Sequence, residues 1–188
     1  MFATPSPLAL PPQRPRRAGF TLIEIMVTLA VLAILVTLVI PSYTDYRVRS
    51  RVSEGLLLAL EAKATVADGV DAAALTARAQ AHNQRSGGNG LSSKYVRSIL
   101  IDPLTGTITI TFLPEAGVTP GADTITLTPY VVAAGAAPVQ VQAVAATGSS
   151  EPLLWGCASA TAGVASSHGV APVVGGTLPA KWAPTECR

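Results

Sequence analysis

The sequence predicts an α+β fold in which a long N-terminal helical region packs on a C-terminal antiparallel sheet of about four strands. Three observations carry this prediction. An apolar run covers Phe20–Ile40, and an amphipathic pattern follows it to about Asp71. Beyond residue 94, threonine-rich segments alternate polar and apolar residues, as half-buried strands do. The 188 residues have room for one domain and an anchor.

The composition is rich in apolar residues, partly because of the apolar run and largely because of small Ala and Val in the C-terminal half. Hydrophobic residues make up 49% of the chain and charged residues only 13%, where soluble domains usually have about a quarter. The formal net charge is +2. It is unevenly placed, because Arg14, Arg16 and Arg17 all precede Gly19. The basic character therefore belongs to the leader and gives no argument for nucleic-acid binding.

Glu24 is the only charged residue between Phe20 and Ile40. A helix of about 20 apolar residues, rising about 1.5 Å per residue, spans a bilayer core of about 30 Å. The run is therefore a helix of membrane length. A carboxylate inside such a span costs about 3 kcal/mol on insertion scales, and this implies a functional partner for it. The alternative is that Glu24 faces water at the membrane interface.

Residues 1–18 precede this run as a leader with five prolines and the three arginines. Prolines oppose a stable helix, and arginines next to a span hold that end in the cytoplasm. A cleaved secretory signal fits poorly, because the run exceeds the about 7–15 residues of such signals and lacks a small-x-small cleavage site after it. A signal anchor that is never cut is the alternative.

The segment Arg17-Ala18-Gly19-Phe20-Thr21-Leu22-Ile23-Glu24 resembles the class III signal of type IV prepilins. The resemblance implies that prepilin peptidase cuts after Gly19 and methylates Phe20, which becomes the mature N-terminus. It also implies that Glu24 of one subunit faces the Phe20 ammonium of the next when subunits stack. Type II secretion pseudopilins share the motif, so the motif alone indicates the superfamily.

Pro41 follows the apolar run and predicts a helix kink or a local break. The resemblance implies that the helix continues past it. Apolar residues then recur three or four apart, so one helix face is expected to bury against the sheet while the other meets neighbouring subunits. These residues are Val48, Val52, Leu56, Leu60, Ala64 and Ala67. Arg47, Arg49 and Arg51 are expected either to touch lipid phosphates or to form a solvated face. Residues 72–84 either extend the helix or form a second one, and residues 85–90 break it.

Candidate strands cover residues 94–102, 107–112, 124–128, 139–144 (the weakest) and 153–158. The side chains expected to face the helix are Ile108, Ile110, Phe112, Ile125 and Leu127. Cys157 and Cys187 are too few for a structural zinc site. In a domain beyond the membrane they are expected to form a disulfide, whereas two free thiols in a cytosolic domain are the alternative.

The C-terminal half also resembles type IVa major pilins. The motifs are Tyr95-Val96-x-Ser98-Ile99, Gly106-Thr107-Ile108-Thr109-Ile110, Thr126-Leu127-Thr128-Pro129 and Trp155-x-Cys157, followed by Leu178-Pro179-Ala180-x-Trp182 and Glu186-Cys187-Arg188, which are similar to the disulfide loop of that family. A pilin-like fold then implies four regions: a cleaved leader (1–19), a transmembrane or filament-core helix (20–40), an amphipathic helix that begins the globular domain (41–84), and the αβ-loop, sheet and disulfide loop (85–188).

Two stretches, residues 131–151 and 159–177, are rich in Ala, Gly, Val and Ser and longer than expected. They are interpreted as unmodified solvated loops or as surface decorations. In the second case the glycan sites would be Ser149, Ser150, Ser166 and Ser167.

No catalytic, cofactor-binding or metal site is predicted, so the protein is not expected to be an enzyme. His82 and His168 lack a second ligand at metal spacing and are expected on the surface. The chain contains no Gly-rich phosphate loop, nucleophile elbow or clustered acid pair.

The resemblance implies the major structural subunit of a type IV pilus, used for adhesion, twitching motility or DNA uptake. The implied partners are further copies of the chain, prepilin peptidase, the inner-membrane assembly machinery and the inner membrane itself, with nucleic acid a partner only through DNA uptake. The precursor would sit in the bacterial inner membrane with a periplasmic C-terminal domain, and the mature protein in an extracellular pilus. The alternatives are a minor pilin or a secretion pseudopilin and, from another class, an anchored binding domain that never polymerises.

Overall fold

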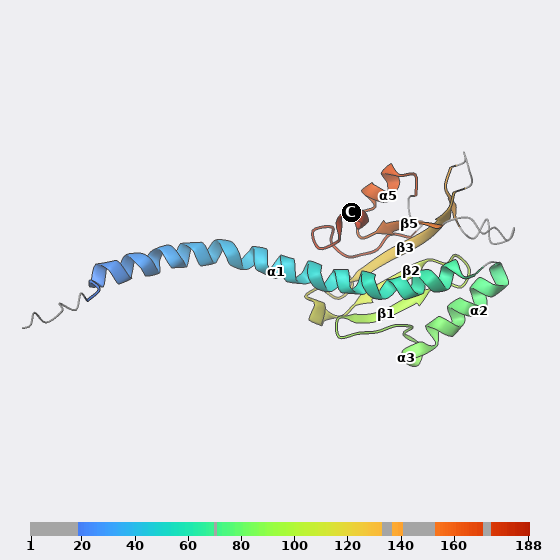
Figure 1. The fold of residues 1–188 in the computed structure, drawn as a ribbon, viewed down its shortest axis with the longest axis horizontal. Helices are drawn as coiled ribbons and strands as arrows, with labels where there is room; N and C mark the ends of the chain where they lie inside the picture. Colours follow the sequence, from blue (N-terminus) through green and yellow to red (C-terminus); the bar gives the residue numbers. More distant parts are fainter. Residues whose placement is uncertain (1–18, 70, 133–136, 141–152, 171–173) are drawn as a thin grey trace, which may run out of the picture. The chain divides into compact units, whose positions relative to one another are not determined.

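The computed structural model of this chain describes residues 19–69, 71–132, 137–140, 153–170 and 174–188. The polypeptide divides into two compact units between Ile40 and Pro41. Helix α1 (Leu22–Ala67) contributes its first part to one unit and its second part to the other. The helices and the longer strands are labelled in Figure 1.

The first unit is an apolar helix. Its large side chains from Leu22 to Ile40 are all exposed within the unit. Two polar side chains in this stretch are satisfied by the helix itself, because Thr28 and Thr37 donate to carbonyls three residues earlier at 2.9 and 2.7 Å. Among the described residues, α1 is the one helix whose length and composition suit a membrane crossing.

The second unit is built on an antiparallel sheet. Its strands are β1 (Val96–Ile101), β2 (Ile108–Phe112), β3 (Thr124–Val131), β4 (Val139–Gln140) and β5 (Leu153–Ala158). Leu127 of β3 pairs with Ile108 of β2 on one side and with Cys157 of β5 on the other. The spatial order is therefore β1-β2-β3-β5, with the two-residue β4 paired to the end of β3. The expected α+β fold with about four antiparallel strands is confirmed.

Strand bounds follow the sequence patterns with local differences. Strand β5 has the expected bounds, whereas β3 continues three residues further, to Val131. Of the weakest candidate strand, residues 139–144, only the first two residues are described, and they form β4. Residues 141–144 lie outside the described part of the chain. The described part of the chain also excludes residues 1–18, which contain the leader arginines, and two of the candidate glycan sites, Ser149 and Ser150.

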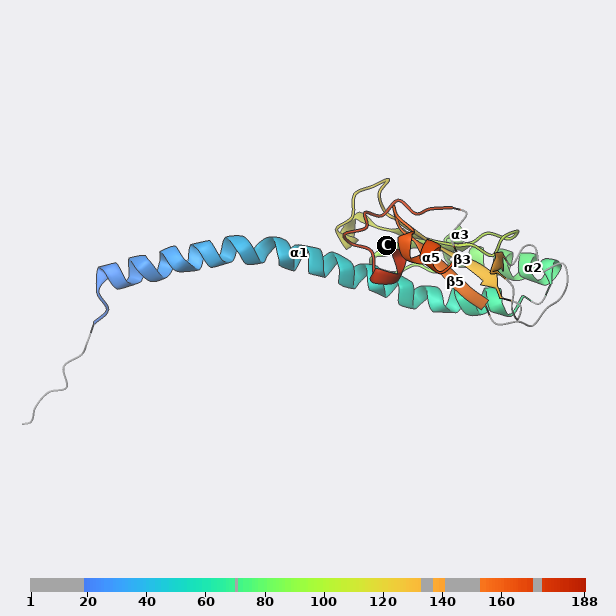
Figure 2. The ribbon, with the colours of Figure 1, turned by 90° about the horizontal axis from the view of Figure 1, so that it is seen from above.

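The second part of α1 lies along one face of the sheet (Figure 2). The expected sheet residues are fully buried there, as Phe112 and the isoleucines of β2 illustrate. The helix residues that cover them are Val48, Val52, Gly55, Ala59, Ala62 and Val66. At Gly55 the helix and sheet approach so closely that a Cβ would lie 2.5 Å from Phe112 Cε1. Glycine permits this contact because it has no side chain.

The predicted helix stripe is wrong in its C-terminal half, because Leu60, Ala64 and Ala67 are exposed. The reason is geometric. Each step of four residues turns about 400°, so a stripe spaced by four drifts about 40° per step around a helix of 3.6 residues per turn. Between Val48 and Leu60 the drift is about 120°. The buried face instead alternates steps of four and three residues and stays against the sheet.

Residues 72–84 form a separate helix, α2 (Ala72–Asn83), rather than an extension of α1. Asp71 begins it, because its Oδ1 accepts a hydrogen bond from Ala74 N at 2.7 Å. A short turn, α3 (Arg85–Gly88), follows, and Ser86 and Gly87 have positive φ within it. The predicted chain break therefore takes the form of a left-handed turn.

Helix α2 is fastened to the outer edge of β1 by side chains near its C-terminus. Asn83 Nδ2 donates to Ile101 O at 2.7 Å, and Asn83 Oδ1 accepts from Ile101 N at 2.8 Å. His82 Nε2 lies 3.1 Å from Ile99 O. The expectation of a surface histidine is wrong for His82, which is 3% exposed, because α2 packs on β1 instead of projecting into solvent. His168 is exposed, as expected.

Candidate functional site

The first candidate surface is the start of the apolar helix. Gly19 and Phe20 precede α1 and are exposed, and a Cβ on Gly19 would meet no atom within 4 Å. Thr21 caps the helix, because its Oγ1 accepts a hydrogen bond from Glu24 N at 3.3 Å. Glu24 lies in the first turn, where a negative charge is favourable beside the unpaired backbone N–H groups.

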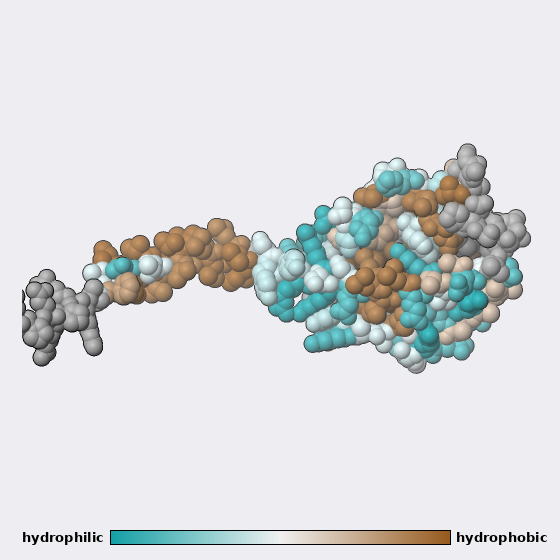
Figure 3. Space-filling model, viewed as in Figure 1, coloured by the Kyte–Doolittle hydropathy of each residue, from teal (hydrophilic) through white to brown (hydrophobic). Residues whose placement is uncertain are grey.

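The carboxylate of Glu24 is exposed and pairs with no cation among the described residues. It is the only charged side chain between Leu22 and Ile40, where the other exposed side chains are apolar apart from two threonines that bond to their own helix. Figure 3 shows that most of this stretch is hydrophobic. This arrangement leaves a single charged contact point on a largely apolar helix.

The second candidate surface is the C-terminal segment of the other unit. Cys157 on β5 and Cys187 in the turn η2 (Thr185–Cys187) form a disulfide, as expected. Two further bonds tie the segment to α1. Trp182 Nε1 donates to Asp45 Oδ1 at 2.9 Å, and Arg49 Nε donates to Lys181 O at 2.7 Å. The segment is therefore fixed to both the sheet and the helix.

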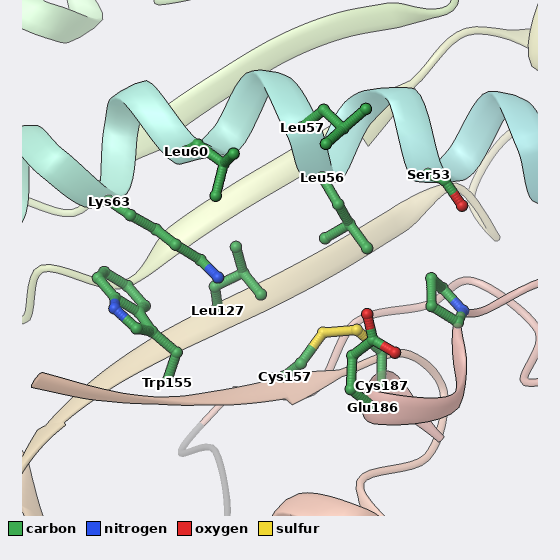
Figure 4. A pocket seen from close by; sticks show the side chains of 11 residues that line it. Ser53, Leu56, Leu57, Leu60, Lys63, Leu127, Trp155, Cys157, Glu186 and Cys187 are labelled. Atoms are coloured by element: carbon green, nitrogen blue, oxygen red, sulfur yellow. A yellow bond between two sulfur atoms is a disulfide. The ribbon is translucent and has the colours of Figure 1, made fainter.

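Between this segment and α1 lies a groove with a volume of about 380 Å³ (Figure 4). Its lining residues are Ser53, Leu56, Leu57, Leu60, Lys63, Leu127, Trp155, Cys157, Pro184, Glu186 and Cys187. Lys63 Nζ lies 5.3 Å from the centroid of the Trp155 ring. Burial lowers the pKa of Lys63, while the nearby Glu186 carboxylate partly offsets this lowering. The groove is therefore mostly apolar, with one cation and one anion on its lining.

Comparison with known proteins shows that the segments carrying both surfaces match pilin sequences. Residues 14–40 match the prokaryotic N-terminal methylation motif, and residues 48–188 match the family described as pilin (bacterial filament). A crystal structure of a type IV pilin from Pseudomonas aeruginosa (strain Pa110594) is 36% identical, with a TM-score of 0.70, over 75% of this chain and 97% of that one. The chain belongs to the type IV pilin family.

Curated relatives match over a shorter stretch. The type IV major fimbrial protein FimA of Dichelobacter nodosus is 50% identical over 50 residues, which is 27% of this pilin and 31% of FimA. The type IV major pilin protein PilE1 of Neisseria gonorrhoeae is 46% identical over 50 residues, which is 27% of this pilin and 30% of PilE1. These matches therefore span less than a third of the relatives' length.

The arginines that follow the apolar run have roles in the pilin fold that the sequence did not reveal. Arg51 Nη1 donates to Glu115 O at 2.8 Å, and its guanidinium lies 4.7 Å from the centroid of the Tyr95 ring. Arg49 holds the C-terminal segment, as described above. Neither residue is simply part of a solvated face. The guanidinium of Arg47 lies over the ring of Tyr43 on the same helix, 5.8 Å from its centroid.

The sequence also gave little sign of Gly55, Asn83 and Asp45, which fix α1, α2 and the C-terminal segment to the fold. A glycine inside an amphipathic helix was the one available signal, because glycine there disfavours the helix unless a close contact requires it. Within the described residues, no group of three or more His, Cys, Asp or Glu side chains could hold a metal ion.

Proposed function

We propose that this pilin is the major structural subunit of a type IV pilus and polymerises through the first part of α1. The observation that carries the proposal is the first part of α1, from Leu22 to Ile40, whose large side chains are exposed in their own unit and which bears one charge. An apolar surface of this extent marks a contact with lipid or protein. A pilus subunit meets both in turn: the inner membrane first, and then the helices of other subunits.

The segment before α1 suits processing by prepilin peptidase. The backbone at Gly19 is exposed and carries no side chain, so a protease can approach it closely. Cleavage of the Gly19–Phe20 bond frees an ammonium group on Phe20, and methylation of this group preserves its charge. The mature helix then starts with one cation and carries one anion a single turn later, at Glu24.

These two charges provide a reason for ordered assembly. In lipid or in a filament core, each unpaired charge is unfavourable, whereas the Glu24 carboxylate of one subunit beside the Phe20 ammonium of the next removes both penalties. Deleting one partner of a buried pair costs about 3–5 kcal/mol. The pair therefore acts mainly on the register of neighbouring subunits.

Three further features are assigned within this proposal. The disulfide Cys157–Cys187 supports a domain outside the cytoplasm, because disulfides persist in oxidising compartments. In this proposal the globular unit lies in the periplasm before assembly and on the outside of the pilus afterwards. Pro41 is assigned as the site of a helix kink, because a proline inside a helix removes a hydrogen bond. The leader, residues 1–19, is assigned as the part that is cut away.

Removal of the Glu24 charge tests the pairing. Glu24→Ala in the full chain is expected to be synthesised, inserted and cut normally, yet to assemble few filaments. Glu115→Ala is the matched control, because it removes an exposed carboxylate from the globular unit. Counting sheared surface filaments compares the two. Normal filament numbers from Glu24→Ala would refute the pairing.

The intact mass of the mature chain tests the broader proposal. A chain that starts at Phe20, gains one methyl group in place of hydrogen and lacks two hydrogens supports both processing and the disulfide. A chain that retains Met1–Gly19 identifies an anchored domain that does not polymerise and contradicts the proposal. Copy number in sheared filaments distinguishes the major subunit from a minor pilin.

A further inference from the structure

The side of α1 that carries Tyr43 in the globular unit also carries two arginines. Arg47 and Arg51 are four residues apart and therefore lie one turn apart on the same side of the helix. Like charges at this spacing repel each other. Neither guanidinium forms an ion pair with a carboxylate of the described residues. Positive charge is therefore concentrated here without being neutralised by the fold.

Both guanidinium groups line one pocket with a volume of about 350 Å³, here called the arginine pocket. Its lining residues are Tyr43, Tyr46, Arg47, Ser50, Arg51, Glu54 and Tyr95. Arg47 makes no hydrogen bond within the described part of the chain and lies over the Tyr43 ring. Arg51 uses Nη1 to bond Glu115 O, and other N–H donors of its guanidinium remain. The pocket therefore offers N–H groups on two cations to a ligand that can accept them.

The two carboxylates in this stretch of α1 bond to neutral groups. Asp45 bonds to the C-terminal segment, as described above, and Glu54 Oε1 accepts from Ser93 Oγ at 3.0 Å. Glu54 also lines the arginine pocket, whose two arginines and one carboxylate give a formal charge of +1. Lys94 adds a further cation beside it, because its Nζ lies 5.5 Å from the centroid of the Tyr95 ring. A ligand with a negative charge therefore complements this surface.

The arginine pocket follows the apolar run closely in the chain. Tyr43 and Arg47 come three and seven residues after Ile40, which is about 5 and 11 Å of helix at 1.5 Å per residue. The headgroup layer of a bilayer is about 5–8 Å thick on each side of the core, and long arginine side chains can reach back towards it. Tyr43 and Tyr46 are 58% and 70% exposed, and tyrosine is enriched at membrane interfaces. A chain anchored by the apolar run therefore keeps the pocket close to the lipid headgroups.

We infer that the arginine pocket binds the phosphate of an anionic phospholipid in the membrane that anchors the chain. A guanidinium presents pairs of N–H groups that match two phosphate oxygens, and such charge-assisted bonds are short and strong. Free phosphate offers the same oxygens, but a lipid is also held by its acyl chains beside the apolar helix. The lipid is therefore the occupant that the site favours. The inference rests on the part of the proposed function that puts the first part of α1 in the inner membrane.

Native mass spectrometry of the full chain tests the inference. The chain is purified in a neutral detergent with equal amounts of phosphatidylglycerol, which is anionic, and phosphatidylcholine, which carries the same phosphate beside a cation. The wild type is expected to retain more phosphatidylglycerol, and Arg47→Gln is expected to lower this preference about fivefold, the usual effect of one basic residue at an anionic membrane surface. Arg78→Gln is the matched control, because it removes an exposed arginine from α2, away from the pocket lining. The leader arginines are common to all three chains, so only the pocket differs.

An unchanged preference in Arg47→Gln, or an equal loss in Arg78→Gln, would overturn the inference. Millimolar inorganic phosphate is expected to leave the bound lipid in place, whereas displacement of the lipid would identify a site for free phosphate and overturn the assignment to the membrane. Fewer filaments from Arg47→Gln without any change in lipid preference would assign the pocket to another partner and also overturn it. The lipid measurement requires no filaments. A chain that shows the preference but never assembles therefore contradicts the proposed function alone, and normal filaments without the preference contradict this inference alone.

Discussion

Replacement of Gly55 by alanine tests the closest contact between helix and sheet. A Cβ at this position would lie 2.5 Å from Phe112 Cε1, 2.8 Å from Cζ and 3.3 Å from Val96 Cγ2. Carbon atoms prefer separations of about 3.5–4.0 Å, so helix and ring would have to separate by about 1 Å. Phe112 is fully buried, so its ring cannot move without displacing other core side chains.

Two opposing effects determine how much Gly55→Ala changes the free energy of unfolding. Adding a methyl group to a well-packed core costs about 1–3 kcal/mol. Replacing glycine by alanine inside a helix contributes about 1 kcal/mol in the other direction. We therefore expect Gly55→Ala to lower the free energy of unfolding by about 1 kcal/mol. The larger Gly55→Leu should lower the free energy of unfolding by several kcal/mol. A leucine side chain clashes with the core more than a methyl group does, whereas its gain in helix propensity over glycine is no larger than that of alanine.

Urea unfolding of the oxidised full chain in detergent measures this effect. Trp155 and Trp182 are the only tryptophans of the chain, and both belong to the globular unit, so their fluorescence follows that unit alone. Ser53→Ala, an exposed site on the same helix, is the control for helix propensity. Phe112→Leu should relieve the clash and make Gly55→Ala less harmful in the double variant. An increase in stability of about 1 kcal/mol for Gly55→Ala alone would refute the close-contact argument.

Three further predictions use the same unfolding assay. Removing the disulfide with Cys157→Ser and Cys187→Ser, which are 30 residues apart, should cost roughly 3–4 kcal/mol by the loop-entropy relation, and an unchanged midpoint would contradict it. Asn83→Ala should cost about 2 kcal/mol, because it leaves both backbone groups of Ile101 without their side-chain partner, whereas the exposed Gln84→Ala should change nothing measurable. Lys63→Met should stabilise the protein at pH 7. Because burial lowers the pKa of Lys63 from 10.5, the folded state binds fewer protons than the unfolded state just below pH 10.5. The unfolding free energy of the wild type should therefore rise with pH in that window relative to Lys63→Met, and parallel curves would contradict the assignment.

Local periodicity was enough to predict the central strands of the sheet. The alternation in residues 107–112 and 124–128 predicted β2, β3 and the side chains that they bury, because a strand places every second residue on one face. The two cysteines predicted the disulfide for a simple reason: few other uses exist for a single pair outside the cytoplasm.

Local periodicity was not enough to decide which face of the helix is buried against the sheet. Uncharged residues recur every three or four positions on two sides of α1, one series starting at Tyr43 and the other at Val48, and only the sheet decides which one is covered. The chosen stripe crossed from one face to the other, so Leu60 was assigned to the wrong side. His82, Asn83 and the Asp45–Trp182 bond depend on partners 17 to 137 residues away, and no local pattern reveals such contacts. The N-terminal segment was predictable as a candidate site because its signal is contiguous in the sequence.

The fastening of α2 to β1 has a consequence for the exposed edge of the sheet. An open sheet edge invites other chains to add strands to it, which leads to unwanted fibres. At β1 this edge is occupied, because Ile99 N donates to the carbonyls of Asn89 and Leu91 at 3.1 and 3.0 Å, and both backbone groups of Ile101 bond to Asn83. Strand addition is blocked at these residues. The chain thus protects this edge of its sheet with its own backbone carbonyls and one side chain, and in the proposed filament contacts between subunits are left to other surfaces.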